Sequence, residues 1–234
     1  PGKNCRSPHH AEHKHGDANH SFSVFDEGRR WKNFATGEGG DVIDFVANTP
    51  GAIAAFERSL PLAANARDRC AAWIGIATGY RVTSTLPPAF EALEHAQALA
   101  ECNAFDRERA HIHYLRGNLH FVAGKGEACR AEHEQALQFA QRAGDTECEA
   151  QAYSGLGDAY YAQGRMRSAH DAFTLCVAIC DREGLTRFAI MNSVMIEIIE
   201  SWMGDSAAAL TRLARVGADA GNFRHRLAET MIAE

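Results

Sequence analysis

Six side chains that could bind a transition metal lie close together near the start of the chain. They are one thiol and five imidazoles: Cys5, His9, His10, His13, His15 and His20. A structural zinc site holds four such ligands in a tetrahedron. No Cys-x-x-Cys or His-x-x-x-His pair lies on a predicted helix or strand here, so the other interpretation is a polar, histidine-rich leader. Cys5, His9 and His10 are therefore weak metal candidates, and we predict no cofactor.

Two other groups of side chains invite the same question. Glu108, His111 and His113 resemble a ligand set, but residues two apart on a predicted helix lie on different faces. We therefore expect these histidines to be solvated or packed. Cys176 and Cys180 lie one helical turn apart, and we expect them to belong to the core.

The glycine-rich segment ATGEGGD, residues 35–41, could bind a phosphate through backbone amides. It lacks the lysine, the serine or threonine and the spacing of a P-loop. The sequence also shows no paired catalytic carboxylates and no nucleophile beside a positioned base. We predict that the protein is not an enzyme.

A period of 40 residues organises most of the chain. Small residues recur at this spacing in two columns, and mostly large apolar residues recur in a third. The columns are Ala89, Cys129, Ala169 and Ala209; Ala96, Ala136, Cys176 and Val216; and Leu93, His133, Phe173 and Leu213. Small residues allow two helices to approach closely, and the large residue between them fills the groove. The columns predict paired helices that pack in one repeating way.

Each block of the period contains two helical segments of about 15 to 20 residues, separated by a breaker such as Gln163-Gly164-Arg165. Gly144 and Gly184 lie where the blocks end, as expected for residues that follow a helix C-terminus. The predicted fold is all-α, a right-handed solenoid of antiparallel helix pairs. It should span residues 52–234.

These blocks resemble the tetratricopeptide repeat in a long-helix variant, most specifically over residues 155–176. More narrowly, the runs ARDRCAAWIGIATGYR, ERAHIHYLRGNLHF and GLGDAYYAQGRMRSAHDAFTLCVAIC resemble the helical C-terminal part of bacterial signalling proteins with class III nucleotide cyclase and ATPase domains. Neither catalytic domain is present in this sequence. The resemblance implies a sensing or docking segment, and both a fragment of such a protein and a fusion stay open as explanations of the chain.

The segment SFSVFDEGRRWKNFATGEGGDVIDFV, residues 21–46, resembles the zinc-binding domain of bacterial and phage DNA primases. The resemblance implies a strand at SFSV, a glycine-rich turn and a helix at DVIDFV, so residues 1–48 should form a small α+β, zinc-ribbon-like remnant. Asn33 and Thr36 occupy the positions of that family's second cysteine pair. We therefore expect no stoichiometric structural zinc.

The junction between the two parts leaves two explanations open. Ala52 and Phe56 have the spacing of Ala169 and Phe173, so they predict the second helix of a repeat whose first helix is absent. Either residues 41–48 supply the missing helix, or a truncated repeat region is joined to foreign sequence.

Charge and composition limit the partners of the chain. The net charge is −6, with 30 acidic and 24 basic residues, so a non-specific nucleic-acid interaction is not expected. No apolar run reaches the roughly 20 residues that span a bilayer. Seven cysteines without a short-spaced disulfide framework favour reduced thiols. We expect a cytoplasmic protein without a membrane partner.

Two functions follow as hypotheses. The first is a scaffold that binds a protein or peptide in the concave groove that the tetratricopeptide resemblance implies. Its candidate residues are Arg81, His111, Tyr114, Asn118, Phe121, Gln151, Ser154, Asp158, Tyr161 and Trp202. For Phe121 and Tyr161, burial between adjacent repeats is an equal alternative. The second function is nucleic-acid binding through Arg29, Arg30, Trp31 and Lys32, which alternatively form a hairpin turn and a core tryptophan.

Overall fold

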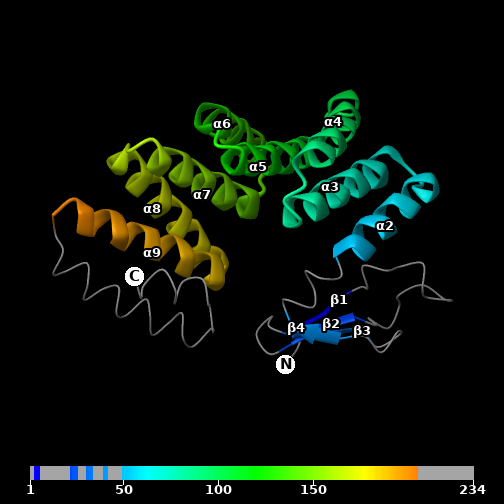
Figure 1. The fold of residues 1–234 in the computed structure, drawn as a ribbon, viewed down its shortest axis with the longest axis horizontal. Helices are drawn as coiled ribbons and strands as arrows, with labels where there is room; N and C mark the ends of the chain where they lie inside the picture. The colour runs from blue at the N-terminus through cyan, green and yellow to red at the C-terminus, as the bar shows by residue number, and fades with distance from the viewer. Residues whose placement is uncertain (1–2, 6–21, 26–29, 34–38, 42–48, 205–234) are drawn as a thin grey trace. The chain divides into compact units, whose positions relative to one another are not determined.

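The computed structural model describes residues 3–5, 22–25, 30–33, 39–41 and 49–204. The chain divides into two compact units, residues 1–103 and 104–234. Helices dominate both, as Figure 1 shows, so the predicted all-α architecture is confirmed.

The first unit begins with four short strands in an antiparallel sheet of order β1-β2-β3-β4. They are β1 (Lys3–Cys5), β2 (Phe22–Phe25), β3 (Arg30–Asn33) and β4 (Gly39–Asp41). The strand predicted at SFSV is confirmed. The structure differs from the prediction at the glycine-rich turn, because residues 39–41 form a strand that pairs with β3. Residues 42–48, where a helix was expected, lie outside the described residues.

Three helices and a short turn of 3-10 helix complete the described part of this unit. They are α2 (Thr49–Ser59), η2 (Leu60–Leu62), α3 (Ala66–Val82) and α4 (Leu86–Cys102). The amide of Asp68 donates to the side chain of Asn65 at 2.9 Å and so caps the start of α3. Phe56 of α2 lies against Gly75 of α3, where a Cβ atom would come within 2.6 Å of its ring. Helix α2 therefore packs on the repeat that follows it.

The second unit contains five described helices, each packed against its neighbours in sequence (Figure 1). They are α5 (Asp106–Val122), α6 (Gly126–Ala143), α7 (Thr146–Ala162), α8 (Met166–Glu183) and α9 (Thr186–Trp202). Helices α5 and α7 also contact each other directly. Each is the first helix of its pair, so equivalent faces of successive repeats are adjacent.

The helices start at a constant interval. From α3 to α9 the first residues are Ala66, Leu86, Asp106, Gly126, Thr146, Met166 and Thr186, each 20 positions after the last. Two such steps make the predicted period of 40, which is thereby confirmed. The residue columns had shown only the longer period, because the first and second helices of a pair bury different residues.

One residue in the turn after each of these helices adopts a left-handed backbone conformation. These residues are Ser84, Ala104, Gly124, Gly144, Gly164, Gly184 and Gly204, again 20 positions apart. Glycine suits such turns because it has no Cβ atom to clash. Ser84 and Ala104, with φ of 55° and 53°, adopt the same conformation with a side chain. The turn geometry therefore holds even where the sequence does not favour it.

The three predicted columns form the core wherever the structure describes them. Ala89, Cys129 and Ala169 are fully buried, and so are Ala96, Ala136 and Cys176. The ring of Phe173 lies against Gly157 of α7, and a Cβ atom at Gly157 would come within 2.6 Å of it. Glycine is required there because the aromatic ring occupies the space that a side chain would need.

Candidate functional site

Eight residues predicted to line the partner groove lie on the first helices of two adjacent repeats in the second unit. We call them the first-helix face: His111, Tyr114, Asn118 and Phe121 on α5, and Gln151, Ser154, Asp158 and Tyr161 on α7. His111 and Phe121 are exposed, and the other six are half-buried. Because α5 and α7 contact each other, the eight residues form two neighbouring rows.

Tyr114 links the first-helix face to the interior. Its ring packs against a buried cluster of Ala110, Ala140 and Cys148, which come from α5, α6 and α7. The ring also lies 5.9 Å from that of His133 on α6, measured between centroids. One side of Tyr114 is thus fixed by three helices, which limits the rotamers of the half that reaches solvent.

The two outer aromatic residues of the face differ in their surroundings. Tyr161 packs against the buried cluster formed by Ala169, Phe173 and Ile199. Phe121, its equivalent one repeat earlier, keeps 47% of its surface exposed. These contacts favour the interface alternative for Tyr161 and leave Phe121 as an accessible aromatic surface.

Asp158 is half-buried on α7 and makes no hydrogen bond or ion pair with the described residues. Burial alone raises the pKa of its carboxyl from 3.8 to about 6. Asn118 is the equivalent residue on α5. The negative charge of Asp158 also helps to raise the pKa of the Cys129 thiol to about 11, after the larger effect of burial.

His133 lies directly behind the face and is more deeply buried than a histidine usually is. It is 1% exposed, and its ring fits between Gly117 of α5 and Gly155 of α7. Cβ atoms at these glycines would come within 2.6 Å of Nε2 and 2.5 Å of Nδ1, respectively. Burial lowers the pKa of His133 to about 4, although nearby Glu132 opposes this shift. Its Nδ1 has no hydrogen-bond partner among the described residues.

The predicted separation of His111 and His113 is confirmed. The His111 ring lies 6.3 Å from that of Tyr114, whereas His113 Nδ1 lies 2.7 Å from Glu132 Oε2. His113 also stacks on Phe139 at a centroid distance of 5.3 Å. The two histidines therefore face different surroundings and cannot share a ligand.

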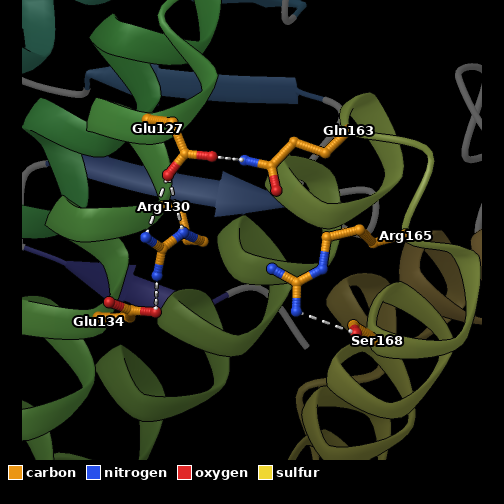
Figure 2. Close-up of polar contacts among 6 residues, drawn as sticks. All are labelled: Glu127, Arg130, Glu134, Gln163, Arg165 and Ser168. Atoms are coloured by element: carbon orange, nitrogen blue, oxygen red, sulfur yellow. Dashed lines mark hydrogen bonds and ion pairs between the residues drawn. The ribbon is translucent and has the colours of Figure 1, made fainter.

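The edge of the repeats is held by polar contacts between helices and turns (Figure 2). Arg130 of α6 pairs with Glu127 at 3.1 Å and with Glu134 one turn later. Gln163, at the end of α7, donates to Glu127 at 3.2 Å and so connects one repeat to the next. Arg165 donates to Ser168 Oγ at 3.5 Å. Most of these side chains reach solvent, so each contact adds little to the stability of the fold. Their main effect is to fix how neighbouring helices and turns are aligned.

The remaining candidate residues belong to other elements than α5 and α7. Arg81 is half-buried on α3 in the first unit, and its Nε has no hydrogen-bond partner among the described residues. Trp202, in the last turn of α9, is 72% exposed. Trp31 belongs to β3, together with Arg30 and Lys32.

Most candidate metal ligands lie outside the described residues, namely His9, His10, His13, His15 and His20, and so does the nucleic-acid candidate Arg29. Cys5 ends β1. Within the described ranges, no three His, Cys, Asp or Glu side chains gather as metal ligands would, and no helix there has the length and apolarity to cross a bilayer. Cys176 and Cys180 are fully buried, with their sulfur atoms 3.9 Å apart, so their predicted place in the core is confirmed.

Comparison with known proteins bears on the repeats alone. The tetratricopeptide repeat family matches residues 108–182, which cover α6 and α7 and most of α5 and α8. This segment is similar to tetratricopeptide repeats. No curated protein matches the chain. The match leaves the primase-like resemblance of residues 21–46 untested, because it lies in a different part of the chain.

Solved structures extend the tetratricopeptide fold beyond that segment. A Rap protein complexed with competence and sporulation factor superposes with a TM-score of 0.70 at 16% identity, over 81% of this chain and 54% of that chain. Aspartyl phosphate phosphatase F from Bacillus subtilis gives 0.71 at 12% identity, over 82% and 51%. The chain thus spans about half the length of both. These likenesses show the fold.

A third solved structure is a signal transduction ATPase with numerous domains from Pyrococcus horikoshii, which has a tetratricopeptide repeat sensor. It superposes with a TM-score of 0.69 at 13% identity, over 81% of this chain and 30% of that chain. The fold of these structures therefore resembles that of most of this chain.

Proposed function

We propose that the chain is a non-catalytic protein-interaction module that docks or senses a partner within a bacterial signalling protein. The observation that supports this most is the contact between α5 and α7, whose equivalent faces lie side by side and 40 residues apart. The first-helix face offers the apolar surface of Phe121 and the side-chain amides of Asn118 and Gln151. An extended peptide needs this combination, because its side chains seek apolar contacts and its backbone seeks donors and acceptors.

The comparisons favour the same role. One similar structure contains a tetratricopeptide repeat sensor, and another was solved with a competence and sporulation factor. We extend these descriptions to this chain as a proposal, because its helical repeats are the part that would bind a partner. A cytoplasmic location fits the free thiols of Cys70, Cys102, Cys129, Cys148, Cys176 and Cys180.

A peptide selection tests the proposal with the whole chain. A library of random N-acetylated octapeptides on beads is sorted against the labelled protein, and selected peptides are resynthesised for fluorescence anisotropy. Phe121→Ala should weaken their binding by about tenfold, as expected for an aromatic contact. Leu175→Ala is the matched control, because Leu175 on α8 is 48% exposed and lies outside the face. Equal binding by the two variants, or no selected peptide, would contradict the proposal.

A further inference from the structure

Asp158 differs from every other residue of the first-helix face in its charge. The face contains no lysine, arginine or glutamate, and its remaining members are aromatic, amide, hydroxyl or imidazole side chains. The equivalent positions on α5 and α9 are Asn118 and Ile198. The carboxylate is therefore no part of the repeating pattern, and the repeat architecture alone does not account for it.

Nothing within the described part of the chain compensates this charge. Asp158 makes no hydrogen bond or ion pair there, and desolvation is the only cause that raises its pKa. A cation near enough to pair would lower that pKa instead. Holding an uncompensated carboxylate in partly desolvated surroundings costs free energy. A ligand that brings a positive charge to Asp158 would recover part of that cost.

We propose that the first-helix face selects peptide segments that contain a lysine or arginine, whose cationic side chain pairs with Asp158. This inference rests on the proposed function and specifies the chemistry of the partner. A flexible basic side chain can reach a half-buried carboxylate while the peptide backbone stays near Asn118 and Gln151. Charge complementarity of this kind selects partners as well as strengthening binding.

A metal ion fits the same position less well. Calcium and magnesium need several oxygen ligands, and no group of three acidic, histidine or cysteine side chains gathers anywhere in the described ranges. A peptide N-terminal ammonium has the right charge but lies at the end of a chain. N-acetylation of the library peptides removes this ammonium, and a second library with free N-termini tests it separately.

The test extends the bead selection to variants of Asp158. Wild-type protein should enrich lysine or arginine at one peptide position. Asp158→Asn should lose that preference, and Asp158→Lys should enrich aspartate or glutamate instead. Asp181→Asn, which changes an exposed carboxylate on α8, should retain the wild-type preference. Thermal melts followed by circular dichroism establish that each variant is folded.

A selected peptide and its counterpart with glutamine in place of the base give the magnitude. The exchange should weaken binding to wild-type protein at least about tenfold, and much less to Asp158→Asn. Binding to the wild type should also weaken as the pH falls from about 7.5 to 5, because protonation of Asp158 removes its charge. Asp158→Asn should lack this pH dependence.

The outcomes separate the two proposals. Selected peptides without a basic residue, or a basic preference that persists in Asp158→Asn, would overturn the role of Asp158 and leave the proposed function intact. Selection only from a library with free N-termini would assign the charge to the terminal ammonium and also overturn the inference. No selected peptide from either library would overturn both proposals.

Discussion

Replacing His133 by leucine should remove a pH-dependent loss of stability from the second unit. The imidazole is 1% exposed, and its pKa in the folded chain is about 4, against an ordinary value of 6.5. As the pH falls, the unfolded chain takes up this proton first, so the folded state loses stability between about pH 6.5 and 4. The difference between the two pKa values corresponds to a loss of about 3 kcal/mol in the free energy of unfolding at the acidic end of that range. Leucine occupies the matching column position at Leu93 and has a similar volume.

Urea unfolding at about pH 8 and pH 4.5 measures this effect for the wild type and His133→Leu. The variant should equal or slightly exceed the wild type at the higher pH, because it loses a buried nitrogen without a partner. At the lower pH it should be more stable by about 2–3 kcal/mol. His111→Leu, which changes an exposed histidine of the same unit, is the control and should show no such gain. A difference between wild type and His133→Leu that stays constant with pH would refute a neutral, buried imidazole.

Three further predictions concern stability. Phe173→Ala should lower the free energy of unfolding by about 3–5 kcal/mol, because the ring is 1% exposed and its removal leaves a cavity. Urea titrations with a local probe in α8 measure this loss, and a value below about 1 kcal/mol would contradict the place of Phe173 in the core. Ala104→Gly should raise stability by about 0.5–1 kcal/mol by relieving its left-handed φ of 53°, and Gly164→Ala should lower it; identical melting temperatures for all three proteins would argue against strain. Asp158→Asn should stabilise the chain by about 1–3 kcal/mol near pH 8 and hardly at all near pH 4. The reason is that the carboxyl has a pKa of about 6 in the folded chain, so its ionised form is unfavourable above that pH. Calorimetry that finds the same gain in stability at both pH values would rule this out.

The repeat architecture could be predicted because its signals are local and recurrent. A column of small residues needs only a side chain of the right size at each position, and Cys129 and Ala169 are both fully buried as the spacing predicted. Helix ends were visible where glycine marks them, as at Gly144 and Gly184. They were hidden at Ser84 and Ala104, because the packed helices on either side impose a conformation that the residue itself disfavours.

The electrostatic character of the site could not be predicted in the same way. His133 falls in a column of large apolar residues, so the sequence indicated its position but not its neutral state, which follows from the two glycines around its ring. Among the described residues no cation pairs with Asp158, and this depends on how residues distant in sequence pack around it. Tyr161 and Phe121 have equivalent positions, yet Tyr161 packs against a buried cluster that includes Ile199 of α9, whereas Phe121 keeps 47% of its surface exposed.

The constant spacing of the left-handed turns also determines which changes in length the array can accept. One extra residue inside a helix would rotate every later side chain of that helix by about 100° around the helix axis. The rows of the first-helix face on α5 and α7 would then no longer lie side by side. Addition of a whole block of 40 residues would leave each turn, column and face in phase. Such an array can therefore lengthen by duplication of helix pairs, and each copy would bring another row of surface side chains that is free to diverge while the buried columns stay the same.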